Sequence, residues 1–256
     1  MENTLTIKGL SRVVRGAPTA NHPTGLFVGP KGWQGWEGLP AGRREALARA
    51  LTHGEHDVPV KLPARVLTID GLVIADSEYQ LRTLSQSVTG WGATGDRFIL
   101  KVEHQGQELT AIVRRILSEA DDTGRRNGLV HVSNFQTQLL AADPRKYGDT
   151  QTLPLDAPAT TEIAVYHRGN FPAFPVVVFQ AAPSAYAIET PAGRFEVDGA
   201  TAGGTHRVDL RTGQVTRNGV LMPDVGRGPL WAAPDGPATI IYLSVPGQVE
   251  ITNTFV

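Results

Sequence analysis

The chain has 256 residues, with 24 Lys and Arg against 25 Asp and Glu, and it contains no cysteine. This length fits two average domains or one large one. The even charge balance argues against a nucleic-acid-binding face and against a polybasic membrane anchor. The lack of cysteine excludes disulfides, thiolate zinc sites and cysteine nucleophiles. No apolar run reaches the roughly 18 residues that a transmembrane helix needs.

The first unusual segment is the loop sequence GWQGWEG at 32–38. Two tryptophans three residues apart and separated by glycines do not favour a helix. Trp33 and Trp36 can be a sugar-stacking platform, or they can dock into a neighbouring subunit, since Trp is enriched at interface hot spots. They can also cover the core of their own domain. The two residues are therefore candidates for an interface or a sugar site.

Two short helices are predicted in the first half of the chain. Over 43–53, Leu47, Ala50 and Leu51 share one helical face, and Gly54 suits the C-terminal end. Over 78–88, apolar residues recur at helical spacing after a Ser77–Gln80 capping pattern, and Gly90 follows.

Strands are indicated by period-two alternation at 65–69, 97–103 and 108–113. The last two flank a four-residue segment at 104–107, which predicts a hairpin. A third strand at 129–132 follows a Gly-containing turn, so the three strands predict an antiparallel meander.

A domain boundary is predicted at 157/158, giving domains 1–157 and 158–256. The second half consists of short strands separated by Pro, Gly and Asn turns, which indicates a β-sandwich. The apolar, β-branched run 176–179 predicts a strand that is buried on both faces. The other strands are predicted at 185–190, 194–198, 206–210, 214–217, 238–244 and 249–254.

No catalytic, cofactor or metal site is predicted. The segment His53-Gly54-Glu55-His56-Asp57 resembles a metal cluster, but its His spacing differs from the helical spacing of zinc proteases. No G-x-S-x-G elbow, dinucleotide fingerprint or P-loop is present. Carboxylates that could form a glycosidase pair all adjoin turn or cap signals, where Asp and Glu bond the backbone. These are Asp70, Asp76, Glu78, Asp121 and Asp122. The protein is therefore not expected to be an enzyme.

Four stretches occur in an order that resembles one known family. They are RVLTIDG at 65–71, PRKYG at 144–148, VYHRGNFPAFPVVVFQ at 165–180 and VDLRTGQVTRNG at 208–219. Together they resemble the distal tail protein family of long-tailed siphophages, whose members are also called minor tail proteins. The stretch 29–57, with its Gly-Trp loop, departs from the family pattern.

The resemblance implies a mainly β protein: an N-terminal split β-barrel with short helices, then a galectin-like β-sandwich. It implies a structural virion protein of the tail tip, assembled in the host cytoplasm. Copies would form a ring, usually of six, that joins the tail tube protein to the tail-tip hub or baseplate, and DNA would pass through its lumen. The alternative is a carbohydrate-binding, lectin-like adhesion protein that recognises host surface glycans.

Overall fold

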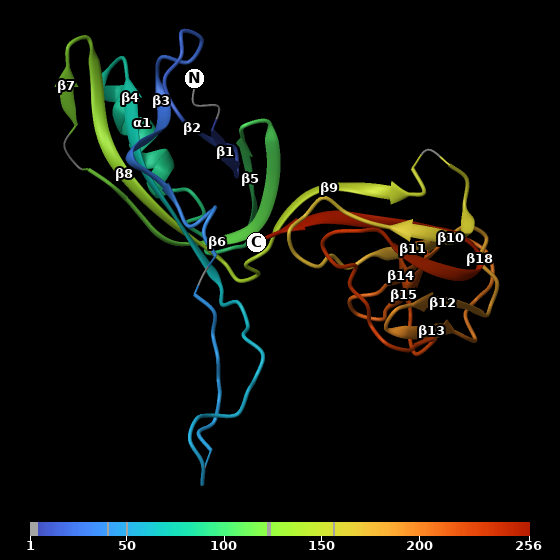
Figure 1. Ribbon diagram of the computed structural model, residues 1–256. Coiled ribbons are helices and arrows are strands. Elements are labelled where there is room, and N and C mark those ends of the chain that lie inside the picture. Colours follow the sequence, from blue (N-terminus) through green and yellow to red (C-terminus); the bar gives the residue numbers. More distant parts are fainter. Residues whose placement is uncertain (1–4, 40, 50, 122–123, 156) are drawn as a thin grey trace. The chain divides into compact units, whose positions relative to one another are not determined.

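The computed structural model describes residues 5–39, 41–49, 51–121, 124–155 and 157–256. The chain divides into two compact units: the first ends at Lys146 and includes Val256, and the second comprises Tyr147–Phe255 (Figure 1). Both units consist mainly of strands, so the predicted fold class is confirmed at that level. The boundary predicted from sequence, after residue 157, lies beyond the first strand of the second unit.

Seven strands of the first unit close into a barrel. Their order around it is β1, β2, β3, β4, β8, β6 and β5, and β5 pairs back onto β1. Every neighbouring pair is antiparallel except β2 with β3. Closure leaves the barrel without an open sheet edge. The strands are β1 (Thr6–Gly9), β2 (Arg12–Arg15), β3 (Gly25–Gln34), β4 (Arg65–Ala75), β5 (Phe98–His104), β6 (Gln107–Ala120) and β8 (Val130–Ala141), and the short β7 (Arg125–Asn127) adds to β8.

The predicted hairpin and meander are confirmed. β5 and β6 pair from Phe98 opposite Val113 to His104 opposite Gln107. Gln105 and Gly106 make the turn with φ of 51° and 80°, the left-handed geometry that matches the twist of a two-residue hairpin. β6 then pairs with β8 to complete the meander.

The predicted second helix is also confirmed, as α1 (Glu78–Thr89). Ser77 Oγ accepts from Gln80 N, and Gln80 Oε1 accepts from Asp76 N, so both side chains cap the helix start. Leu81 and Val88 are buried against the barrel, and α1 contacts β4, β6 and β8. Within the described ranges, no helix has the length and apolarity needed to cross a membrane.

The predicted helix at 43–53 is wrong. Residues 41–49 and 51–64, here called the arm, form an extended excursion between β3 and β4 (Figure 1). Isolated bridges join Arg43 to Lys61 and Ala48 to Glu55 across it. Leu47 is 75% exposed, so no core surface is present to cover a helical apolar face, and packing rather than propensity stabilises short helices. Ala50, part of the same prediction, lies outside the described residues.

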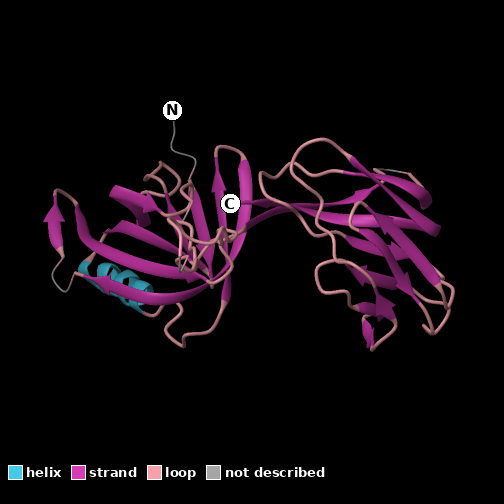
Figure 2. Cartoon of the chain, turned by 60° about the horizontal axis from the view of Figure 1, so that its bottom comes forward, coloured by secondary structure: helices cyan, strands magenta, loops and turns pink. Residues whose placement is uncertain are grey.

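The second unit contains two sheets that share the long strand β18 (Figure 2). Near Ile240–Leu243, β18 pairs with β10 and β12, and near Gln248–Glu250 it pairs with β11. The prediction of separate strands at 238–244 and 249–254 is therefore wrong, because β18 (Thr239–Phe255) continues through the predicted turn and passes from one sheet to the other. The first sheet contains β10 (Thr160–Val165), β12 (Tyr186–Thr190), β13 (Gly193–Val197) and β17 (Gly226–Arg227), and the second contains β9 (Lys146–Leu153), β11 (Val176–Phe179), β14 (His206–Asp209), β15 (Val215–Arg217) and β16 (Val220–Met222).

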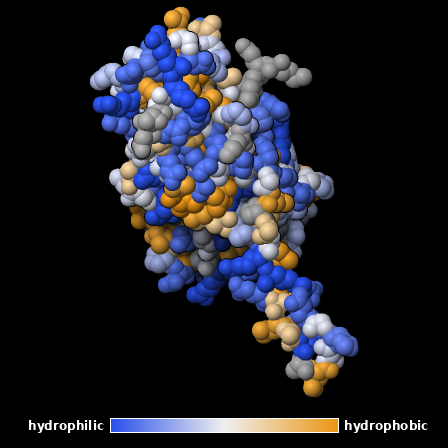
Figure 3. Space-filling model, turned by 90° about the vertical axis from the view of Figure 1, so that its left-hand side faces the viewer, coloured by the Kyte–Doolittle hydropathy of each residue, from blue (hydrophilic) through white to orange (hydrophobic). Residues whose placement is uncertain are grey.

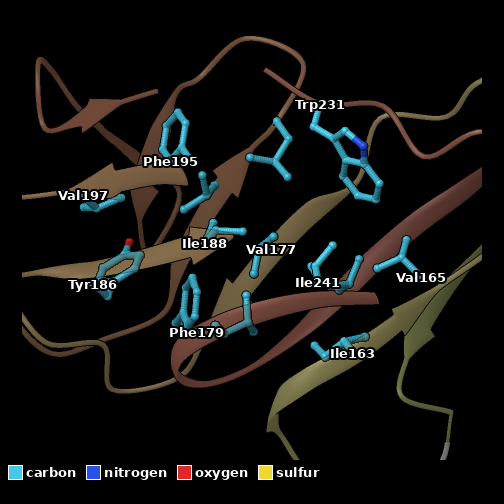
Figure 4. Packing of buried hydrophobic residues seen from close by; sticks show 14 of the residues in the cluster. Ile163, Val165, Val177, Phe179, Tyr186, Ile188, Phe195, Val197, Trp231 and Ile241 are labelled. Carbon is cyan, nitrogen blue, oxygen red and sulfur yellow. The ribbon is translucent and has the colours of Figure 1, made fainter. Parts of the chain in front are cut away.

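Side chains from both sheets form one core in the second unit (Figure 4). Ile188 and Phe195 come from the first sheet, Phe179 comes from the second, and Trp231 closes one side. β11 lies between β14 and β18, and Val177–Phe179 are buried, so the prediction for this run is confirmed. The likeness of this unit to galectins stays a prediction.

Gly71 in β4 tests how tightly the barrel is filled. It lies opposite Phe135 of β8, and a methyl group at Gly71 would lie 2.2 Å from Phe135 Cζ. We expect Gly71→Ala to lower the free energy of unfolding by about 1–3 kcal/mol through overpacking, measured by urea denaturation. Gly38→Ala is the control, because a methyl group there meets no atom within 4 Å. Equal midpoints for the two variants would contradict this account of the packing.

Candidate functional site

The two tryptophans of the Gly-Trp loop lie against their own barrel. Trp33 is in β3, opposite Ile69 of β4, and Trp36 follows the end of that strand. Their ring centroids are 5.6 Å apart, with the planes tilted by 35°. Trp36 is only 2% exposed, and Trp33 is half-buried. Trp36 therefore offers no ring face to a sugar in the single chain. The interface and sugar-stacking roles of these residues stay predictions.

A buried arginine fixes the loop that carries Trp36. Arg65 begins β4 and is 1% exposed. Its Nη1 donates to the carbonyl oxygens of Gly35 at 2.7 Å, Trp36 at 2.9 Å and Gly38 at 2.5 Å. Its Nε donates to the carbonyl oxygen of Pro144 at 3.0 Å. One guanidinium thus ties the Gly-Trp loop to the chain segment that precedes β9.

A second buried cation contacts the same loop. Lys146 Nζ donates to the Trp36 carbonyl oxygen at 2.9 Å and lies 5.3 Å from the centroid of the Trp36 ring. Glu37 Oε2 is 3.8 Å from Nζ, but the Glu37 side chain is 71% exposed. Burial lowers the pKa of both Arg65 and Lys146, and the Glu37 carboxylate opposes that shift. Both cations of the cluster donate hydrogen bonds to backbone carbonyls of the loop.

A hollow of about 360 Å³ opens beside this cluster. Trp36 and Glu37 line one side, and His104 at the tip of the β5–β6 hairpin lines another. His104 Nδ1 is 3.9 Å from Glu37 Oε1. A hollow of mixed polarity next to a rigid loop can receive a side chain of another protein molecule.

The outer face of β5 and β6 carries exposed isoleucines. Ile99 is 62% exposed and lies directly opposite Ile112, which is 52% exposed. Ile116, further along β6, is 51% exposed. These three residues are here called the isoleucine face. Adjacent exposed aliphatic side chains in the middle of strands are typical of protein–protein contact surfaces.

The arm is a second exposed element with apolar side chains. Leu47, Leu51 and Val60 are 75%, 97% and 62% exposed. Figure 3 shows apolar atoms near the end of the arm, where it narrows away from the rest of the surface. Exposed aliphatic side chains gathered on one segment are typical of a surface that contacts another protein molecule.

The arm also contains the segment that resembled a metal cluster. The carboxylates of Glu55 and Asp57 face Arg44, at 2.5 Å and 3.5 Å. Across the ranges that the structure describes, no group of three or more His, Cys, Asp or Glu side chains is placed to hold a metal ion. Arg44 instead joins the two limbs of the arm electrostatically.

Two of the candidate carboxylates accept hydrogen bonds from side chains of β8. Asp70 Oδ1 accepts from Gln136 Nε2 at 2.7 Å, and Asp121 Oδ2 accepts from Asn134 Nδ2 at 2.7 Å. Asp122 lies outside the described residues. The prediction that the protein is not an enzyme stays a prediction.

No protein-family model and no curated protein matches the sequence. Solved structures match almost its whole length. The crystal structure of the SPP1 Dit (gp 19.1) protein, described as a paradigm of the hub adsorption apparatus in phages that infect Gram-positive hosts, aligns with a TM-score of 0.75 at 16% identity, over 98% of this chain and 99% of that chain. This chain shares the fold of the SPP1 Dit protein. The phage P2 baseplate in its activated conformation aligns with TM-scores of 0.50 with Ca and 0.52 with Sr, at 7% identity over 97% of this chain and 98% of the other.

Arg65 offers a direct test of how the Dit-like barrel fixes its loop. Replacing Arg65 with Met removes four hydrogen bonds to main-chain carbonyls, and of these acceptors the Trp36 carbonyl keeps its hydrogen bond from Lys146. We expect a loss of roughly 3–5 kcal/mol in the free energy of unfolding, with a red-shifted tryptophan emission as Trp36 becomes exposed.

Arg125→Met is the matched control for this substitution, since Arg125 lies in β7 and is exposed. Urea denaturation followed by fluorescence measures both variants. If Arg65→Met were as stable as Arg125→Met, the Arg65 hydrogen bonds would not be what holds the loop.

Proposed function

We propose that this protein is a structural component of a phage tail tip. Its copies form a ring, expected to be hexameric, that joins the tail tube to the tail-tip hub or baseplate, and DNA passes through the lumen. The observation that carries the proposal is the likeness to the SPP1 Dit protein along 98% of this chain and 99% of that chain, through both units. The protein would therefore be found in the virion, at the tail tip, after assembly in the host cytoplasm.

Two exposed patches of the first unit support the proposal of a ring. A ring forms by heterologous contacts, in which two different patches of the same chain meet and the rotation closes. The isoleucine face and the arm are two different exposed patches of one unit. Obligate interfaces commonly bury more than about 2,000 Å² and are apolar at the centre, so both patches suit such a contact.

The second unit and the charge of the chain fit the same role. Two sheets around one core support a galectin-like unit carried by the ring-forming barrel. Lys and Arg number 24 against 25 Asp and Glu. Strong phosphate contacts would slow passing DNA, so a conduit without excess positive charge is favourable. No catalytic step is part of the proposal.

The isoleucine face tests the proposal through two neighbouring residues of β5. Multi-angle light scattering and negative-stain microscopy of the wild-type protein should show a ring with a mass near six times the 27.5 kDa chain. Ile99→Asp should leave the fold intact and abolish the ring, because Ile99 is 62% exposed. Leu100→Asp should prevent folding, because Leu100 is fully buried in the barrel. A wild-type monomer at every concentration would overturn the ring. Native-sized rings from Ile99→Asp would remove the isoleucine face from the ring interface, and native-sized rings from Leu100→Asp would contradict the account of the barrel core.

The arm is tested separately from the barrel. The double variant Leu47→Ser, Leu51→Ser should keep the thermal unfolding midpoint of the wild type, because both side chains are exposed in the single chain. It should weaken assembly, so that the concentration at which half of the protein is in rings rises at least about tenfold. Val220→Ser is the control, since Val220 is an exposed aliphatic residue of the second unit, at 70%. Unchanged assembly of the double variant would remove the arm from the interface.

A further inference from the structure

The second unit carries a hollow of about 360 Å³ on the outward face of β12, β13 and β18. This volume falls within the range of about 300–1,000 Å³ that is usual for small-molecule sites. Arg194, Glu196 and Asp198 form one side of the hollow, and Ser244 lies on the other. The hollow lies on the side of the sheet that faces away from Ile188 and Phe195.

Strand register explains why this part of the sheet is hollow. Ala187 of β12 lies opposite Glu196 of β13, and on its other side its main-chain N donates to Ser244 Oγ at 2.8 Å. Two small side chains, Ala187 and Ser244, therefore stand where longer ones would fill the face. These short side chains form the bottom of the hollow, beside the longer charged side chains of β13.

The next row of the same face is charged and aromatic. Arg194 lies opposite Glu189, Glu189 lies opposite Tyr242, and Tyr242 lies opposite Glu162 of β10. Tyr242 is 50% exposed although it is in the middle of the sheet. Its ring is thus an exposed aromatic surface with a carboxylate on each side and the hollow beside it.

The guanidinium of Arg194 is held in place by two carboxylates. Arg194 Nη1 contacts Glu189 Oε1 at 2.8 Å, and Arg194 Nε contacts Glu196 Oε1 at 2.7 Å. These two partners restrict the rotamers of Arg194, so a ligand has less side-chain entropy to remove on binding. Arg194 still has further N–H donors, and the carboxylates have further lone pairs, that can bond hydroxyl groups.

We propose that this face binds a neutral pyranose of a glycan. The C–H face of the sugar ring packs on Tyr242, its hydroxyls donate to Glu189 and Glu196, and Arg194 donates to a sugar oxygen. The choice of a neutral sugar follows from charge. Four carboxylates, those of Glu162, Glu189, Glu196 and Asp198, outnumber the two arginines of this face, Arg194 and Arg227, and the excess of negative charge disfavours an acidic sugar. The site is independent of ring assembly, because it uses residues of one unit.

The test uses the full chain and titrations followed by saturation-transfer NMR. The probes are the methyl glycosides of glucose, galactose, mannose and N-acetylglucosamine, with methyl glucuronide as the acidic counterpart of methyl glucoside. We expect at least one neutral glycoside to bind saturably with a Kd of about 1 mM, as a single small ring with few anchoring contacts should. The glucuronide should bind at least about tenfold more weakly than the glucoside.

Variants decide whether the binding occurs at this face. Tyr242→Ala should weaken binding at least about tenfold, and Tyr242→Phe, which keeps the ring, should stay within about threefold of the wild type. Tyr79→Ala removes a tyrosine that is 83% exposed in the first unit and should change nothing. Thermal unfolding shows that each variant is folded. The proposal would be overturned if none of the four neutral glycosides bound, if the glucuronide bound as tightly as the glucoside, or if Tyr242→Ala bound like the wild type.

Discussion

The hydrogen bonds of Arg65 organise the first unit, because they join its least regular segments to its barrel. The arm leaves the barrel after the Gly-Trp loop and returns to it immediately before Arg65. Gly38, at the departing end, is held by the side chain of Arg65, at the returning end. The two ends of the arm are therefore held together at the barrel, and the bridges from Arg43 to Lys61 and from Ala48 to Glu55 keep its two limbs side by side. An arm fixed at its base loses less conformational entropy on binding than a loose loop would.

Burying the Arg65 guanidinium costs free energy of hydration. A guanidinium that is 1% exposed loses most of its hydration. The hydrogen bonds to four carbonyl oxygens offset part of that loss, while Nη2 is buried with no hydrogen-bond partner among the described residues. Lys146 adds a second cation nearby, and Glu37 only partly balances the two because it is exposed. Such a cluster is poorly suited to proton transfer but well suited to fixing one loop conformation. Its rigidity is also what presents Glu37 and the neighbouring hollow in a constant geometry.

The sequence was informative where the signal is local and less so where it depends on distant partners. The Gln105-Gly106 turn and the Ser77 cap are set by neighbouring residues, and both were predicted. The helix at 43–53 failed because an amphipathic pattern presupposes a core to pack against. Arg65 could have been predicted as buried, since it shares the inward face of β4 with Leu67 and Ile69. The row from Glu162 to Tyr242 could not, because it depends on a register between strands far apart in the sequence.

The isoleucine face of the first unit and the face around Tyr242 in the second unit differ in the kind of contact that they favour. The isoleucine face gains free energy roughly in proportion to the apolar area that a partner covers, and it suits a permanent contact. A partner must also accommodate Arg114, which is exposed between Ile112 and Ile116 on β6. The face around Tyr242 is mostly charged, and its groups already satisfy one another through Arg194. A ligand there replaces water at modest net gain, so each contact is weak and reversible. Assembly would change this balance, because a ring that presents one such face on every copy multiplies weak contacts into avidity when the copies can engage the same glycan surface.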